Sequence, residues 1–454
     1  MKILTTAKLL GTLLLTGMLL QGCSQPDAPT TPATAPDTTQ AAPAPLSAEA
    51  IHAKALVLDA HADIEIPGKE SSYVGADGKS KVAPDKMRAG GVDAVVMSVA
   101  VGPGPRDAGG YAEARALADA KLAAVMDLVA DPANNLVLAR SADELLAAHA
   151  NGQGALILGL QNARIFGTSV DTIDEFYNSG VRVFALTHMG HNDFADSSRP
   201  LYNNDIGDHE PESEHGGLSA LGQAAIARIN ALGAIVDISQ LSKAAALQVL
   251  AQTTAPVIAS HSNVRQLTNV SRNLSDEEID LIGANGGVIH IAPFRGYLFN
   301  STDASLDLKI RAARRAAGIK EDSYYPFELY WEINDPAIKQ TFLTTVSELL
   351  GPGSLDDVLN HIDYVVQRIG IDHVGIGTDF NHGSGLDGFN DASEALNVTK
   401  ALLARGYSAS DIEKIWGGNF VRVFRQAAQS ATTDLAEDAT AAIGDKESPL
   451  HLPM

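Results

Sequence analysis

The sequence predicts an α/β fold, a TIM-type (β/α)8 barrel, on the strength of three observations. Short apolar runs alternate with longer amphipathic stretches, which is typical of strands and helices in a parallel α/β fold. Eight of these runs are strand-like, the number that closes such a barrel. No change in composition divides the region that contains them. A doubly wound open sheet is the alternative that this pattern leaves open.

The strand-like runs are short and rich in β-branched residues. They span residues 55–59, 94–99, 155–159, 181–186, 234–238, 257–260, 287–291 and 373–377. Amphipathic stretches predict helices between them, for example over residues 111–130, 220–232 and 355–369. We expect the pockets for substrate side chains to lie in loops such as 200–216 and 300–333.

The N-terminus predicts an export signal that ends at a lipidated cysteine. Lys2 and Lys8 precede an apolar run over residues 9–20, which is too short to span a bilayer with margin and suits a signal-peptide core. Leu20-Gln21-Gly22-Cys23 resembles a bacterial lipobox, although Gln21 departs from the commonest pattern. Cys23 is the only cysteine of the chain, so we expect no disulfide.

Lipid chains on that cysteine would anchor the protein to a bacterial membrane without a membrane-spanning helix. Ser24 and Gln25 carry no inner-membrane retention signal of the Asp type. We therefore expect an exported protein at the cell envelope, on the outer membrane facing the periplasm rather than on the inner membrane.

Composition divides the chain into a signal peptide (1–23), a Pro/Ala/Thr-rich tether (24–47), the barrel domain (48–429) and a flexible tail (430–454). The tether and the tail contain too little apolar surface to fold by themselves. The 55 acidic and 33 basic side chains give a formal net charge of -22, which repels a phosphate backbone and excludes nucleic acid as a partner. A homodimer is compatible with the sequence.

Polar residues follow the predicted strands, at the end of a barrel where active sites are built. They are His61, Asp63, Gln161, His188, Gln240, His261 and Asp379. Imidazole and carboxylate groups are ligands that suit Zn²⁺. The sequence therefore predicts a metal site at the mouth of the barrel.

The His-x-Asp spacing of His61 and Asp63 is a weak signal by itself, because residues 191–193 and 361–363 repeat it. Its position after a strong strand favours a metal site, since both side chains would face the barrel mouth. Asp379 could cap a helix, but a carboxylate at that mouth is better explained as a ligand and base. His188 and His261 could each be hydrogen-bonded core histidines instead.

These residues resemble the membrane (renal) dipeptidases, peptidase family M19, a branch of the amidohydrolase-like barrels. The resemblance runs from about residue 56 to 424. The matching stretches are 59–63, 87–92, 186–188 with 192 and 195–197, 217–219, 232–233, 236–239, 256–262, 271–273, 372–380 and 417–420.

The resemblance implies hydrolysis of dipeptides by a water that bridges two zinc ions. It implies that His61, Asp63 and Asp379 bind the first metal and that His261 binds the second. Asp379 would also be the catalytic base, and His188 would contact the substrate and its tetrahedral intermediate. Arg272 would hold the substrate's C-terminal carboxylate in a bidentate fork.

Two metal-ligand positions diverge from the family. Gln161 stands where the family has a glutamate that bridges both metals, and Gln240 stands where it has a second-metal histidine. A glutamine offers one neutral oxygen, and its amide nitrogen only donates. We therefore expect one Zn²⁺ per chain, with the second site weak or absent. One zinc can still lower the pKa of a water to near 7.

The first hypothesis is a zinc-dependent dipeptidase-like hydrolase in the periplasm or at the cell envelope, with reduced activity or an altered reaction as an option. The alternative is a retasked homologue that binds or matures a peptide-like metabolite such as a siderophore precursor, because exported relatives serve siderophore assembly. A third hypothesis, a barrel used only as a scaffold, does not explain why His188 and Arg272 match the family.

Overall fold

The computed structural model describes residues 46–203, 208–319 and 333–432. The chain divides into two compact units, residues 1–45 and 46–454, and every described residue belongs to the second. The predicted signal peptide with Cys23, nearly all of the tether and the tail beyond residue 432 lie outside the described residues. Within the described ranges no helix is long and apolar enough to cross a membrane.

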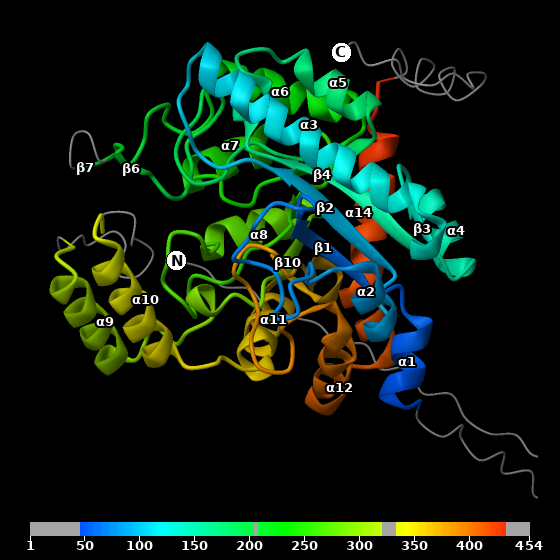
Figure 1. Ribbon diagram of the computed structural model, residues 1–454. Helices are drawn as coiled ribbons and strands as arrows, with labels where there is room; N and C mark the ends of the chain where they lie inside the picture. Colours follow the sequence, from blue (N-terminus) through cyan, green and yellow to red (C-terminus); the bar gives the residue numbers. More distant parts are fainter. Residues whose placement is uncertain (1–45, 204–207, 320–332, 433–454) are drawn as a thin grey trace, which may run out of the picture. The chain divides into compact units, whose positions relative to one another are not determined.

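Eight parallel strands form one sheet that curls into a barrel (Figure 1). Their order in the sheet follows the chain: β1 (Leu58–Asp63), β2 (Ala94–Ala100), β4 (Gly154–Gln161), β5 (Val181–Ala185), β8 (Ile235–Asp237), β9 (Ile258–Ala259), β10 (Val288–Ile291) and β11 (Val374–Ile376). A further strand, β3 (Leu136–Leu138), pairs with the first half of β4. The predicted (β/α)8 barrel is therefore confirmed.

The barrel closes between its first and last strands. The amide of Asp63 donates to the carbonyl of Phe380 at 2.9 Å, and the amide of Asp379 donates to the carbonyl of His61 at 2.8 Å. Closure therefore places the end of β1 directly against the segment that follows β11.

Helices alternate with the strands around the barrel (Figure 1). They are α1 (Ala48–Lys54), α2 (Pro84–Gly90), α3 (Ala108–Ala130), α4 (Ala142–Ala150), α5 (Thr172–Asn178), α6 (Ala220–Ala231), α7 (Lys243–Gln252), α8 (Asp276–Asn285), α9 (Ala304–Ala316), α10 (Pro336–Leu350), α11 (Leu355–Ile369), α12 (Ala395–Arg405), α13 (Ala409–Glu413) and α14 (Asn419–Gln429). Local caps fix several starts: Ser219 accepts from the amide of Gly222 before α6, and Ser354 forms a capping box with Asp357 before α11.

The prediction for the first strand was wrong in its bounds. The apolar run over residues 55–59 suggested a strand that ends before His61, whereas β1 spans Leu58–Asp63. The strand continues through polar residues because their backbone is paired with β2 and with the segment after β11. His61 and Asp63 are thus the last alternate residues of the strand, and both point to the same side.

The prediction of a loop over residues 300–333 was also wrong, because helix α9 lies inside it. Asp303 caps this helix by accepting from the amides of Ser305 and Leu306. In Figure 1, α9 and α10 lie side by side as a pair. The predicted loop 200–216 contains a small two-stranded ladder between β6 (Tyr202–Asn203) and β7 (Asp208–His209).

Strand β11 packs unusually close to the end of β9. A Cβ atom at Gly377 would collide with the carbonyl oxygen of Ser260. Glycine is therefore required at residue 377, because only it lets the two strand ends approach so closely. This close approach brings Asp379 toward His61, on β1, and His261, which follows β9.

Candidate active site

Three buried side chains gather at the mouth of the barrel. His61, His261 and Asp379 each offer a ligand atom, and these atoms all lie within 4.8 Å of one another. The imidazole rings of His61 and His261 are stacked, with centroids 3.8 Å apart. Residues that the sequence assigned to two separate metal positions thus form one cluster.

Asp63 completes the acidic side of this cluster. Its Oδ1 lies 3.5 Å from Nε2 of His61. Both atoms are buried, and neither has a hydrogen-bond partner among the described residues. Buried polar atoms normally find a partner, so a lone pair and a carboxylate oxygen that face one another without a donor fit a cation.

The backbone around these ligands is fixed by Asp59 and Thr378. Asp59 accepts from the amide of Thr378 at 2.7 Å and from its hydroxyl at 2.6 Å, which ties the start of β1 to the segment after β11. Asp379 follows with a positive φ of 56°, a conformation that is uncommon outside glycine. This turn holds the Asp379 side chain at the mouth of the barrel.

The two glutamines surround the free nitrogen of His261. Gln240 Nε2 lies 3.2 Å and Gln161 Nε2 lies 3.4 Å from Nε2 of His261. Arg199 Nη2 donates to Gln240 Oε1 at 3.0 Å. Because a guanidinium only donates, this contact requires the Gln240 oxygen to face Arg199 and its amide nitrogen to face His261. Gln240 thus turns an amide nitrogen, which cannot ligate a metal, toward Nε2 of His261, although His261 belongs to the cluster whose ligand atoms lie within 4.8 Å of one another.

A polar relay contacts Nδ1 of both histidines. Ser260 Oγ donates to Asp237 Oδ2 at 2.5 Å, so it accepts from ring nitrogens. Nδ1 of His261 lies 2.7 Å and Nδ1 of His61 lies 3.3 Å from that oxygen. The shorter contact favours a proton on Nδ1 of His261, which leaves the lone pair on its Nε2. Burial lowers the pKa of His61, but Asp63, Asp379 and Asp237 outweigh burial and raise it.

His188 follows β5 and faces the same space. Its Nδ1 is buried and has no hydrogen-bond partner within the described ranges. The hydroxyl of Ser197 donates a hydrogen bond of 2.5 Å to the carbonyl oxygen of His188, which fixes the backbone of His188. His188 is thus placed to meet a bound molecule.

Arg272 is almost fully buried, with 2% of its surface exposed. Its Nη1 donates to Ser262 Oγ at 3.0 Å, and its Nη2 donates to the carbonyl of His261 at 2.6 Å. The guanidinium also lies 5.4 Å from the centre of the Tyr297 ring. The predicted carboxylate contact of Arg272 stays a prediction.

Sequence reasoning missed two residues of this region, Arg199 and His382. His382 Nδ1 lies 3.2 Å from Asp63 Oδ2, and its ring meets that of His188 edge to face at 5.0 Å. Lys121 lies 3.9 Å from the same carboxylate oxygen. His382 follows the last strand by only a few residues, and that position was the available signal.

Electrostatics separate the ionised groups from the neutral ones. Burial raises the pKa of Asp63, but Lys121 and His382 outweigh burial and hold it well below its usual range. Burial raises the pKa of Asp379. Burial, with neighbouring cationic groups, holds the pKa values of His188 and His261 well below their usual range, so both rings are neutral.

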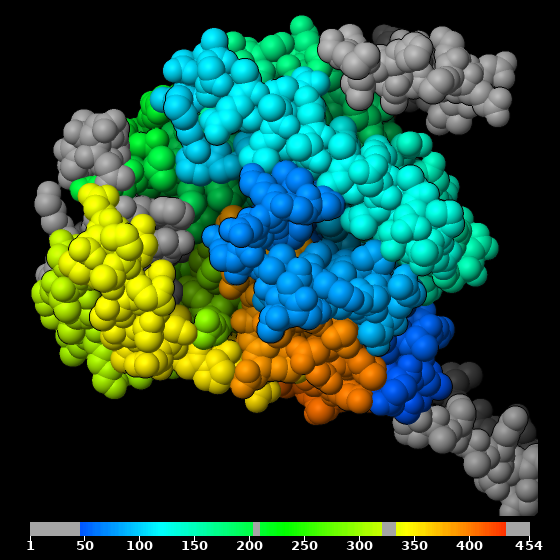
Figure 2. Space-filling model, viewed as in Figure 1, coloured from blue at the N-terminus to red at the C-terminus, as the bar shows by residue number. Residues whose placement is uncertain are grey.

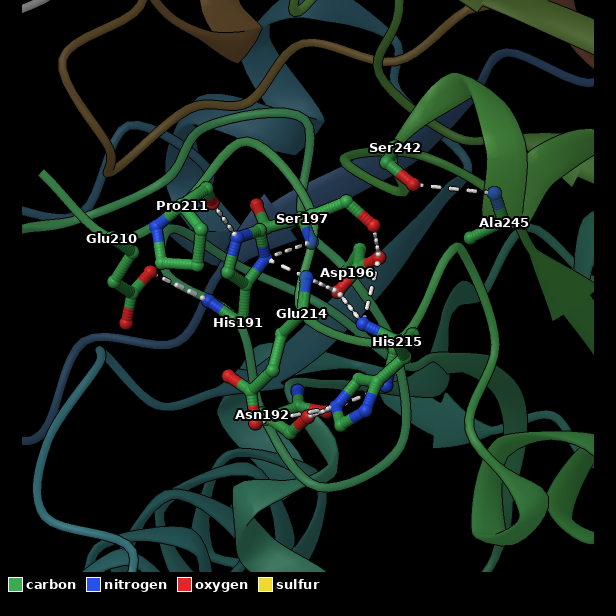
Figure 3. A network of polar contacts seen from close by, with 12 residues as sticks. His191, Asn192, Asp196, Ser197, Glu210, Pro211, Glu214, His215, Ser242 and Ala245 are labelled. Atoms are coloured by element: carbon green, nitrogen blue, oxygen red, sulfur yellow. Dashed lines mark hydrogen bonds and ion pairs between the residues drawn. The ribbon is translucent and has the colours of Figure 1, made fainter.

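The two repeats of the His-x-Asp spacing are structural. In Figure 3, His191 accepts from the amide of Ser197 at 3.0 Å and contacts the carbonyl of Pro211 at 2.7 Å. Nearby, Asp196 accepts from the amides of Glu214 and His215, which holds the loop after β5. In the second repeat, His361 accepts from the amide of Val264 at 3.0 Å.

Comparisons with known proteins find similar folds and sequences among the dipeptidases. The structure of the probable dipeptidase PvdM from Pseudomonas aeruginosa is similar, with a TM-score of 0.75 and 34% identity over 85% of this chain and 98% of that one. Dipeptidase aclJ of Aspergillus oryzae is 32% identical over 61% of this chain and 52% of its own length. Dipeptidase tcpJ of Claviceps purpurea is 29% identical over 71% of this chain and 63% of its own length.

The chain therefore spans between half and two thirds of the length of these two relatives. The model of the membrane dipeptidase family matches residues 46–437, which include the whole barrel and every site residue described above. The chain belongs to the membrane dipeptidase family, peptidase family M19.

Proposed function

We propose that this protein is a dipeptidase-like hydrolase that uses one zinc ion, bound by His61, Asp63 and Asp379. The observation that carries the proposal is the pair of buried atoms, His61 Nε2 and Asp63 Oδ1, which face each other at 3.5 Å without a hydrogen-bond partner among the described residues. Together with Asp379 they supply one neutral and two anionic ligands, which neutralise a divalent charge and leave a position open.

A bound zinc ion would acidify a water and polarise the scissile carbonyl. In the reaction we propose, water oxygen adds to the amide carbon, and Asp379 takes the released proton. Asp379 then passes that proton to the leaving nitrogen as the C–N bond breaks. The neutral ring of His188 is suited to donate to the carbonyl oxygen as charge develops there. Arg272 is our candidate for the substrate's C-terminal carboxylate.

Gln240 supports the choice of one ion over two. A second cation would have to replace the amide nitrogens that surround Nε2 of His261. To ligate that cation, Gln240 would have to turn its oxygen away from Arg199. Its amide nitrogen would then face the guanidinium, and two hydrogen-bond donors would meet without an acceptor. Gln161 brings no negative charge to offset the repulsion between two ions.

The test measures zinc content and dipeptide hydrolysis on the full chain. We expect about one tightly held zinc per chain and measurable hydrolysis with zinc supplied. His61→Ala and Asp379→Asn should each lose both properties. The matched control is His149→Ala, because His149 also lies beside an aspartate, Asp93, but on α4 away from the site. A zinc-loaded wild type that cleaves no dipeptide contradicts the proposal.

The second candidate is a homologue that binds or matures a peptide-like metabolite, such as a siderophore precursor, without acting as a peptidase. The paired replacement at Gln161 and Gln240 favours it, since a working two-metal peptidase has no evident reason to lose both ligands. Tight zinc binding with no hydrolysis of any dipeptide would support this candidate. Two zinc ions per chain with fast turnover would remove the reason for it.

We also propose that Cys23 carries a lipid anchor in the cell envelope, with the barrel in the periplasm. The apolar run over residues 9–20 followed by Leu20-Gln21-Gly22-Cys23 supports this location. Metabolic labelling with a fatty-acid analogue should mark the wild type and leave Cys23→Ser unmarked. Equal labelling of both chains, or of neither, contradicts the anchor.

A further inference from the structure

A cavity of about 450 Å³ opens beside the candidate site. Three of its lining residues, His188, Arg199 and His382, belong to that site, so the cavity and the site form one continuous space. Among the described residues it is also lined by Tyr73, Phe294, Tyr297, and residues of helix α10. Figure 2 shows the surface hollowed between the α9–α10 pair and the segment that follows β1.

Helix α10 gives this cavity an apolar wall. Phe342, Leu343, Val346 and Leu350 line it from one side of the helix. Leu343 retains 36% of its surface exposed, which is high for a leucine that borders a cavity. Its side chain is therefore accessible to a molecule that enters the cavity.

The apolar wall is held firmly in place. Phe342 and Val346 pack with Ile319 and Ile333 in a small core of their own. Arg295 Nη1 donates to Ser347 Oγ at 3.2 Å and to the carbonyl of Gly351 at 3.0 Å, which ties α10 to the segment after β10. The wall is therefore part of the folded domain.

An aromatic pair forms a second apolar surface. The rings of Phe294 and Tyr297 are stacked, with centroids 4.3 Å apart and planes 18° from parallel. The Tyr297 hydroxyl accepts from Arg199 Nη1 at 3.1 Å. His188, Arg199 and His382 thus bring polar groups of the candidate site to the cavity, and Arg295 and Ser347 add polar groups beside α10. Phe294 and the apolar residues of α10 supply its carbon surface. This division is typical of a pocket that orients one polar group and buries an apolar one.

We propose that this cavity is a specificity subsite for a large apolar side chain, aromatic or long aliphatic, of a dipeptide-like substrate. The inference rests on the proposed function, since it names the substrate class of the same site. Pockets of roughly 300 to 1,000 Å³ hold drug-sized ligands. The cavity therefore has room for a phenylalanine or leucine side chain, and small dipeptides leave most of it unfilled.

The test compares Leu343→Asp with a matched control, Leu308→Asp. Leu308 lies on the neighbouring helix α9, is 64% exposed and is not among the lining residues, so both variants place the same charge on the same helical pair. The substrates are Ala-Ala, Phe-Ala and Ala-Phe. We expect kcat/KM of the wild type to be about tenfold or more higher for Phe-Ala or Ala-Phe than for Ala-Ala.

Leu343→Asp should remove most of this preference, measured as the ratio of kcat/KM for a bulky substrate to kcat/KM for Ala-Ala, whereas Leu308→Asp should retain it. A second variant, Leu343→Trp, fills the cavity instead of charging it and should lower kcat/KM for the bulky substrates alone. Equal loss on all three substrates, or no preference in the wild type, overturns the proposal while hydrolysis itself still stands.

Binding of uncleavable analogues keeps the two proposals separate. Reduced-amide analogues of Ala-Ala and of both bulky dipeptides are titrated into the full zinc-loaded chain by calorimetry. Tighter binding of a bulky analogue than of the Ala-Ala analogue, lost in Leu343→Asp, supports the subsite even if no dipeptide is hydrolysed. Equal affinities for all three analogues contradict it even if dipeptides are cleaved.

Discussion

The amide nitrogen of Gln240 lies 3.2 Å from Nε2 of His261, the ring nitrogen that His261 would offer to a metal. Arg199 fixes the orientation of that amide by donating to its oxygen at 3.0 Å. Two neutral amides thus meet His261, the residue that the family resemblance assigned to a second metal, and the Arg199 guanidinium holds one of these amides. The divergence at Gln161 and Gln240 is a consistent change in hydrogen bonding, because both amides meet the same histidine.

Restoring the two family ligands should restore the second metal. We expect the double change Gln161→Glu with Gln240→His to raise zinc content from about one to about two ions per chain, because it returns a negative bridge and an imidazole. Mass spectrometry of metal content after dialysis measures this. The control is Gln252→Glu with Gln426→His, which makes the same chemical changes at exposed positions. A content that stays at one shows that the ligands alone do not decide occupancy.

Arg199 should oppose that second ion. Adding Arg199→Gln to the restored double variant removes a positive charge close to the new site, so we expect the second zinc to bind about tenfold more tightly or better. Competition with a chelator at several concentrations gives both dissociation constants. An unchanged second constant means that the guanidinium lies too far away to repel the ion.

Ser260 should control metal affinity without touching the metal. Its hydroxyl contacts Nδ1 of both histidine rings and donates to Asp237, which favours a lone pair on Nε2 of His261. We expect Ser260→Ala to weaken zinc binding by about 10- to 100-fold, as for other residues that orient ligands. Ser408→Ala is the control, because it removes the cap of α13 and should lower stability but not metal affinity. Equal effects on affinity would point to general unfolding.

His361 should make the fold sensitive to acid. Burial lowers the pKa of His361 from 6.5 to about 3. Below pH 6.5 the unfolded chain therefore takes up a proton that the folded chain refuses until about pH 3. The free energy of unfolding falls as pH decreases through this window, by up to about 1.4 kcal/mol per pH unit.

His361→Gln keeps an acceptor for the amide of Val264 but cannot be protonated in this range. We expect the variant to be less stable than the wild type at pH 8 and to lose less stability between pH 6.5 and pH 4. Urea unfolding at several pH values measures both curves. Parallel curves for the two chains contradict the prediction.

Gly377 should tolerate no side chain. A Cβ atom there would collide with the carbonyl oxygen of Ser260, so Gly377→Ala must push two strand ends apart. We expect a loss of about 3 kcal/mol or more in stability, together with weaker zinc binding. Gly109→Ala is the control, because Gly109 lies exposed in the first turn of α3 and its new Cβ would meet only an ordinary contact. Thermal unfolding of both variants should separate them by several degrees.

The sequence alone predicted the eight strand-helix units of the barrel, because the alternation of strand-like and helix-like runs is a pattern of neighbouring residues. It also determined the ligand types: His61 and Asp63 share a face of one strand through their spacing, and Asp379 follows the last strand. The sequence also showed that Gln161 and Gln240 are poor metal ligands, since an amide nitrogen cannot bind a metal in any position.

Only the tertiary structure decided how those residues meet. The orientation of Gln240 depends on Arg199, the partner of Asp63 is His382, and the apolar wall of the cavity comes from α10. Helix α9 lies where the sequence predicted a loop, and β1 extends beyond its apolar run because backbone pairing with β2 and with the segment after β11 continues it. Apart from helix α9, which begins at the local cap Asp303, each of these features joins residues far apart in the chain. Such contacts follow from barrel closure and packing rather than from local pattern.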